Sequence, residues 1–149
     1  MIWTLKVELL FGTYAEEKWD GLIEIESSST LEELHFAIIG AVNFENDHLY
    51  EFYVSRTERS RDRLRFDVES GIIYDTTLES LYPLEKGRKL YYLFDYGDHW
   101  LFKITKSRKS PQEPKTGIKY PWLLSEVGKA PVQYPVWEEY NVPSIVMTC

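Results

Sequence analysis

The sequence predicts an α+β fold, in which a mixed or antiparallel β-sheet of about five or six strands packs against one main helix under a proline-rich C-terminal cover. Three observations support this class. Apolar and polar residues alternate on both sides of a short polar turn at residues 95–99. A hairpin, a helix and a third strand follow one another within residues 1–55, which is a β-grasp-like opening. Six of the seven prolines lie between Pro111 and Pro143.

The first two strands follow from residue alternation. Apolar residues occupy every second position of residues 3–11, and residues 19–26 repeat the pattern after a turn at 12–15. Such alternation is typical of half-buried strands, and the short connection predicts an antiparallel hairpin.

A helix is predicted next, over Leu31–Val42. Thr30 and Glu33 have the spacing of a capping box, as do Ser29 and Glu32. Leu34 and Ile38 follow at helical spacing, which predicts an apolar face packed on the sheet.

The middle of the chain predicts a third strand at His48–Ser55, a short strand at Leu64–Val68 and a helical turn at Thr76–Leu81 that Pro83 ends. The central hairpin then follows over Leu90–Ile104. Gly97 can adopt the positive φ that such a turn often needs, and the neighbouring aspartates can accept backbone hydrogen bonds.

The composition changes after Lys109. We expect one domain over residues 1–149, with a sheet-plus-helix core at 1–109 and a proline- and aromatic-rich segment at 110–149 that wraps the sheet. Trp122–Val127 is interpreted as one helical turn. The aromatic residues of this segment are expected to complete the core, with partner binding as the alternative; they are Tyr120, Trp122, Tyr134 and Trp137.

Bulk composition excludes several classes. A net charge of −7 opposes broad attraction to nucleic acid or anionic lipid. The one cysteine, Cys149, provides neither a disulfide framework nor a cysteine-based zinc site, which favours a reducing cytoplasm. No apolar run approaches the roughly 18 residues of a membrane span. We therefore expect a cytoplasmic protein with no membrane partner and no cofactor.

The hairpin turn reads Asp95-Tyr96-Gly97-Asp98-His99-Trp100 after an aromatic strand. With Leu34-His35 on the helix and Asp47-His48-Leu49 before the third strand, it resembles the signatures of the plasmid pRiA4b ORF-3-like family. The resemblance covers about Ile2 to Ile104, and Tyr120-Pro121 and residues 128–131 extend it. It implies a fold and an association with plasmids and mobile elements, and no established chemistry. The ending Val132-Gln133-Tyr134-Pro135 departs from the commoner acidic and Cys-Gly-Gly ending.

The same residues are the candidate binding surface, namely Asp95, Gly97, Asp98, His99, Trp100, His48 and His35. Histidine and carboxylate ligands suit divalent metals, which makes a metal-dependent hydrolase the alternative function. No spacing typical of a metal site is present, so we expect the two aspartates to brace the turn and His35 to lie near the core edge.

Five arginines form a row, with a spacing of two from the second onward: Arg56, Arg59, Arg61, Arg63 and Arg65. In an extended segment the last four would share one side and could contact phosphates. Interleaved acids favour a solvated edge that discourages sheet-to-sheet association, so nucleic-acid binding is a third and less favoured function.

A resolvase-type nucleophile is excluded because no serine precedes Ser27, and Ser27–Ser29 are better explained as helix-capping residues. The sequence therefore predicts no catalytic residue and no bound metal. It favours a non-enzymatic binding module with an unknown protein or small-molecule partner.

Overall fold

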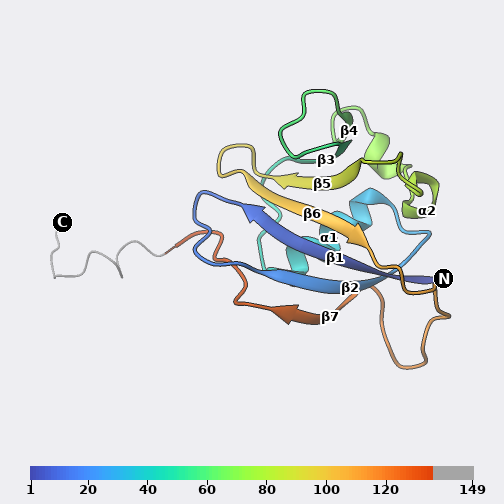
Figure 1. The fold of residues 1–149 in the computed structure, drawn as a ribbon. Helices are drawn as coiled ribbons and strands as arrows, with labels where there is room; N and C mark the ends of the chain where they lie inside the picture. Colours follow the sequence, from blue (N-terminus) through green and yellow to red (C-terminus); the bar gives the residue numbers. More distant parts are fainter. Residues whose placement is uncertain (136–149) are drawn as a thin grey trace, which may run out of the picture.

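The computed structural model describes residues 1–135, which form a seven-stranded sheet with one main helix behind it (Figure 1). The strand order is β4-β3-β5-β6-β1-β2-β7, and the ladders are antiparallel. The strands are β1 (Ile2–Phe11), β2 (Asp20–Glu26), β3 (Tyr50–Ser55), β4 (Leu64–Asp67), β5 (Lys89–Phe94), β6 (Trp100–Lys106) and β7 (Trp122–Val127). The α+β class is confirmed with more strands than expected, and the β-grasp-like description stays a prediction.

The main helix, α1 (Leu31–Ala41), begins at the predicted capping box. The Thr30 hydroxyl accepts a hydrogen bond from the Glu33 N–H at 3.2 Å, and the Glu33 carboxylate accepts one from the Thr30 N–H at 2.9 Å. Leu34 and Ile38 are completely buried between α1 and the sheet. The apolar face was therefore predicted correctly.

Two short helical elements follow β4 in the chain, and the second is hydrogen-bonded to the segment before α1. The 3₁₀ helix η1 (Ile72–Tyr74) was not anticipated, whereas α2 (Leu78–Leu81) lies within the predicted helical turn. The Leu78 N–H donates to the Ser29 carbonyl at 2.9 Å, which ties α2 to the start of α1. No helix in residues 1–135 is long and apolar enough to cross a membrane.

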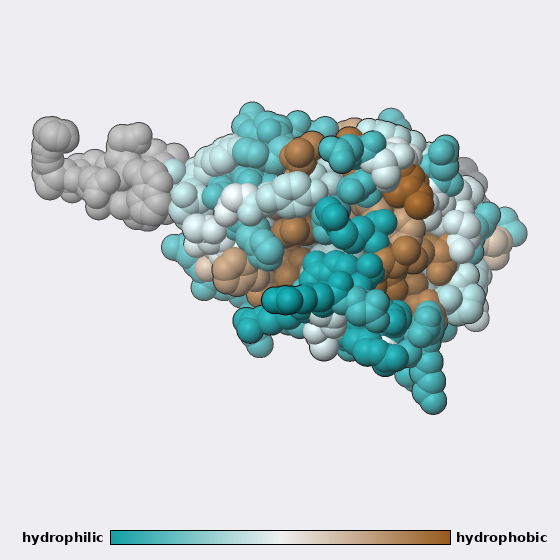
Figure 2. Space-filling view, turned by 90° about the horizontal axis from the view of Figure 1, so that it is seen from above, coloured by the Kyte–Doolittle hydropathy of each residue, from teal (hydrophilic) through white to brown (hydrophobic). Residues whose placement is uncertain are grey.

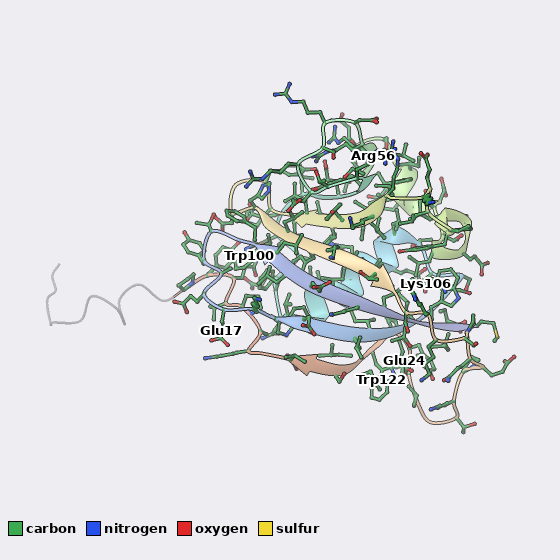
Figure 3. All side chains as sticks on the ribbon, in the orientation of Figure 1. Glu17, Glu24, Arg56, Trp100, Lys106 and Trp122 are labelled. Atoms are coloured by element: carbon green, nitrogen blue, oxygen red, sulfur yellow. The ribbon has the colours of Figure 1, made fainter. Side chains whose placement is uncertain are left out.

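The C-terminal segment corrects one prediction. Trp122–Val127 is not a helical turn but the edge strand β7, which pairs with β2. The Trp122 indole N–H donates to the Glu24 carboxylate at 2.7 Å (Figure 3). The aromatic residues also do not complete the core as expected, because Trp122 and Tyr134 keep 37% and 45% of their surface exposed. Trp137 lies outside the described residues.

Residues 128–135 then cross the end of the sheet. Gly128 passes so close to the Lys18 carbonyl that a Cβ atom would lie 2.2 Å from that oxygen, at a φ of +86°. Farther on, the Gln133 side chain accepts a hydrogen bond from the Glu45 N–H at 2.7 Å. This crossing joins the β1–β2 loop to the α1–β3 loop and builds the site described next.

Candidate functional site

The turn between β5 and β6 is braced by one carboxylate. Asp95 is buried, with a φ of 65°, and its Oδ1 accepts the N–H groups of Gly97 at 3.0 Å and Asp98 at 3.2 Å. The Asp95 N–H donates to the Leu49 carbonyl at 2.9 Å. The turn is thereby attached to the loop that precedes β3. Asp95 braces the turn as predicted. The same prediction for Asp98 was wrong, because among the described residues its carboxylate accepts no backbone N–H.

That attachment brings His48 to the turn. The His48 Nε2 atom lies 3.3 Å from Asp95 Oδ2 and 2.7 Å from the Tyr134 hydroxyl, which itself donates to Asp47 Oδ2 at 2.7 Å. We name Asp47, His48, Asp95, Asp98 and Tyr134 the acidic cluster. It joins three segments that are far apart in the sequence: the α1–β3 loop, the β5–β6 turn and the C-terminal crossing.

Two carboxyl groups of the acidic cluster have shifted pKa values. The hydrogen bond from Tyr134 lowers the pKa of the Asp47 carboxyl. Burial raises the pKa of the Asp98 carboxyl, and the negative charge of Asp95 raises it further. Negative charge is therefore concentrated at this end of the sheet, and a positive ligand would relieve it.

Three predicted site residues lie elsewhere. His35 is fully buried rather than at the core edge, between the Tyr92 hydroxyl at 2.6 Å and the Asn46 side-chain oxygen at 2.9 Å. The exposed ring of His99 packs edge-on against Phe11. Trp100 is buried in the core. The structure therefore gathers only His48, Asp95, Gly97 and Asp98 from the predicted surface.

Sequence reasoning did not assign Tyr134, Asp47 or Gln133 to the site. Gln133 is 6% exposed, and its Nε2 donates to Asp47 Oδ1 at 3.1 Å, which holds the C-terminal crossing in place. Asp47 was visible as part of the Asp47-His48-Leu49 signature. The Tyr134-Pro135 pair was visible as part of the aromatic segment, but nothing in the sequence linked the two.

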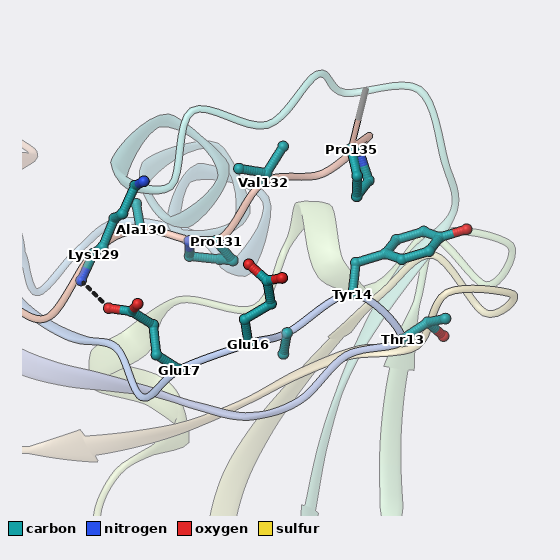
Figure 4. Close-up of a pocket in the computed structure, with 10 residues that line it drawn as sticks. Thr13, Tyr14, Glu16, Glu17, Lys129, Ala130, Pro131, Val132 and Pro135 are labelled. Carbon is teal, nitrogen blue, oxygen red and sulfur yellow. Dashed lines mark hydrogen bonds between the residues drawn. The ribbon is translucent and has the colours of Figure 1, made fainter. Parts of the chain in front are cut away.

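A cavity of about 390 Å³ lies next to the acidic cluster. Figure 4 shows the residues that line it. Thr13 lines it and also donates, through its N–H and its hydroxyl, to the Asp98 carbonyl at 2.9 Å. The walls of the cavity come from the β1–β2 loop and the C-terminal crossing. The lining residues are Thr13, Tyr14, Ala15, Glu16, Glu17, Lys129, Ala130, Pro131, Val132 and Pro135.

The Glu16 carboxylate is the notable polar group of this cavity. It projects into the space bounded by Pro131, Val132 and Pro135 (Figure 4). Glu17, by contrast, accepts the Lys129 N–H at 3.4 Å. Within residues 1–135, the Glu16 carboxylate has no hydrogen-bond or ion-pair partner.

The alternative function, a metal-dependent hydrolase, would need a set of metal ligands. Among the described residues, no group of three or more histidine, cysteine or acidic side chains is placed to hold a metal ion. The acidic cluster can form hydrogen bonds and attract a cation, and it presents no serine or cysteine nucleophile.

The arginine row is divided by the fold. The chain is an extended strand only at β4, so the last four arginines do not share one strand face. Arg63 stacks over the Tyr53 ring at 3.9 Å, and Arg65 pairs with the buried Glu51 carboxylate. Arg56, Arg59 and Arg61 are exposed in the β3–β4 loop.

The two turn aspartates should respond differently to neutralisation. We expect Asp95→Asn to lower the free energy of unfolding by about 1 kcal/mol. The amide keeps one oxygen atom that can accept the two N–H groups, but it lacks the negative charge and has an NH₂ group in place of the second oxygen, which faces His48. Asp98→Asn should leave stability unchanged or raise it, since the half-buried carboxyl is repelled by Asp95. Urea unfolding at neutral pH measures both. Equal losses for the two variants, or divalent-ion stabilisation confined to the wild type, would contradict this assignment.

Comparisons with known proteins support the fold. The family model described as "Plasmid pRiA4b ORF-3-like protein" matches residues 3–133. No curated protein matches the chain. The crystal structure of a protein of unknown function, MM3350 from Methanosarcina mazei Go1, is similar with a TM-score of 0.69 and 21% identity, over 87% of this chain and 70% of that chain. At this identity the likeness extends to the fold alone.

Proposed function

This chain belongs to the plasmid pRiA4b ORF-3-like family, and we propose that it is a non-enzymatic binding module whose ligand occupies the cavity at the end of the sheet. The Glu16 carboxylate carries this proposal. It has no partner among residues 1–135 and projects into a space with proline and valine walls. Glu16 is itself an exposed residue, so its carboxylate is open to a cationic group that approaches along the apolar wall.

The chemical class of the ligand follows from these walls. An ammonium group on an apolar stem would place its charge on Glu16 and its methylene groups against Pro131 and Val132. The nearby acidic cluster adds favourable long-range attraction. A lysine side chain of a partner protein and a free alkylamine share this chemistry. The low cysteine content is in keeping with a cytoplasmic setting for either ligand.

An NMR titration of the labelled full chain tests the site. Blocked lysine, pentylamine and blocked norleucine, which lacks the charge, are added separately at millimolar concentrations. We expect the two amines, but not norleucine, to shift the amide signals of residues 13–17 and 129–133. Glu16→Gln should abolish the shifts, whereas Glu113→Gln, at an exposed position outside the cavity, should not.

The relative affinities of blocked lysine and pentylamine distinguish a protein partner from a free small amine as the ligand. Tighter binding of blocked lysine than of pentylamine would assign a protein partner, and the reverse order would assign a small amine. No amide shift with either amine, or shifts that persist in Glu16→Gln, would overturn the proposed site.

A further inference from the structure

A second charged surface lies at the opposite ends of β3 and β5. Residues 56–65 contain five arginines and two acids, and residues 85–89 contain three cations and one acid. We name these two segments the basic surface. Its net charge is +5, in a chain whose total is −7, so the remaining residues carry −12. The sequence separates the two segments, and nothing local indicates that they meet.

The fold brings the two segments together because β3 pairs with β5. Ser55 at the end of β3 pairs with Lys89 at the start of β5, whereas Tyr50 and Phe94 pair at the end next to the acidic cluster. Arg88 contacts the Asp62 carboxylate at 3.2 Å, and the Lys89 ammonium donates to the Arg56 carbonyl at 3.4 Å. Arg56 and Glu17 accordingly lie toward different ends of the molecule (Figure 3).

Only some of these cations are engaged within the protein. Arg63, Arg65 and Arg88 have aromatic or acidic partners. Within the part of the chain that the structure describes, the side chains of Arg56, Arg59, Arg61 and Lys86 are exposed and have no hydrogen-bond or ion-pair partner. Figure 2 shows the molecule from above, from the side on which β3 and β4 lie in Figure 1. Hydrophilic residues gather in the middle of this face.

A hollow adjoins these free cations. A cavity of about 370 Å³ lies between β4 and the segment after α2. Its charged lining is Arg63 and Arg88 together with Asp62 and Glu85, and both of these acids pair with Arg88. Leu64, Leu81 and Leu84 add apolar lining. The basic surface can therefore contact both charged and apolar groups of a partner.

We propose that the basic surface docks a short acidic segment of a partner protein. This is a second interaction, separate from the cation site at the other end of the sheet. Guanidinium groups bind carboxylates through paired, charge-assisted hydrogen bonds, and Arg59 and Arg61 are unengaged. The apolar lining of the cavity accommodates side chains that accompany the acids.

The small size of the basic surface and the negative charge of the rest of the protein favour an acidic polypeptide over nucleic acid as the ligand. A DNA duplex carries a charge about every 1.7 Å and would extend from this small surface over regions where the protein itself is negative. Single-stranded nucleic acid needs exposed aromatic rings for base stacking. Tyr53, under Arg63, and Tyr91, which stacks on Tyr53, are 2% and 3% exposed. One exposed ring near an arginine is that of Tyr96, which shares the Glu51 carboxylate with Arg65 and lies in the β5–β6 turn rather than beside Arg59 and Arg61.

Fluorescence anisotropy with the full chain tests this proposal. The probes are a labelled glutamate octapeptide and a short labelled DNA duplex, each titrated at physiological salt. We expect the peptide to bind more tightly than the duplex, and Arg59→Glu with Arg61→Glu to weaken peptide binding at least about tenfold. Both arginines are exposed and lack partners among the described residues, so this variant should fold, as thermal melting will verify.

A charge-matched control separates a docking surface from bulk charge. Arg108→Glu with Lys109→Glu makes the same change in net charge at exposed positions after β6 and should keep wild-type peptide affinity. Three outcomes would overturn the proposal: no peptide binding, equal loss in both double variants, or tighter binding of the duplex. The last outcome would assign the surface to nucleic acid.

Discussion

Replacing Leu34 by alanine should lower the free energy of unfolding by about 2–5 kcal/mol, because a fully buried side chain is lost between α1 and the sheet. The removed methyl groups cannot be replaced by water in this apolar site, so the loss combines transfer free energy with the cost of a cavity. Urea unfolding monitored by circular dichroism measures it, and Ile38→Ala should behave in the same way.

Phe36→Ala provides the matched control on the same helix. Its side chain is 49% exposed, so truncation should cost well under half of the Leu34 loss. Losses below about 0.5 kcal/mol at both Leu34 and Ile38 would mean that α1 presents another face to the sheet.

Acidification should destabilise the protein through His35. Burial lowers the pKa of the His35 imidazole to about 4, from an ordinary value of 6.5. The neutral ring can donate from Nε2 to Asn46 and accept from the Tyr92 hydroxyl at Nδ1, while it stacks on Tyr50 at 3.5 Å. A proton on Nδ1 would remove that acceptor inside an apolar layer.

The direction of the pH effect follows from this lowered pKa. The unfolded chain binds a proton at His35 below about pH 6.5, whereas the folded chain resists protonation until about pH 4. The contribution is therefore complete above pH 6.5 and is lost as the pH falls toward 4, by about 3 kcal/mol in total.

Urea unfolding between neutral pH and pH 4 measures this loss. His35→Gln should be less stable at neutral pH but show a shallower decline on acidification. His99→Asn is the matched control, because its exposed ring lies at a φ of 56° that asparagine tolerates, and it should keep the wild-type decline. Parallel profiles for wild type and His35→Gln would contradict the assignment to His35.

Much of the fold could be predicted because its signals are local. Alternation over a few residues determines the β1–β2 and β5–β6 hairpins, and the Thr30–Glu33 capping box fixes the start of α1. β7 could not be predicted in this way. The run Trp122–Val127 lacks clear alternation, and its strand geometry depends on hydrogen bonds to β2, a segment about one hundred residues earlier.

The candidate site could be predicted only in part. The turn was visible, together with Asp95, because aspartates beside a glycine have a local mechanical role. The contacts of His48 with Asp95 and Tyr134 span long stretches of sequence and depend on how the C-terminal crossing packs. The cavity at Glu16 arises from the same crossing and has no counterpart in the local sequence.

The sequence by itself therefore determined the α+β class, the capped helix and the braced turn, since each depends on residues a few positions apart. Only the tertiary structure decided that His35 is a core residue, that β7 extends the sheet edge, and that acidic and basic surfaces lie at opposite ends of β3 and β5. The physical reason is that strand pairing and loop packing join distant segments, whereas local patterns specify only what each segment can form.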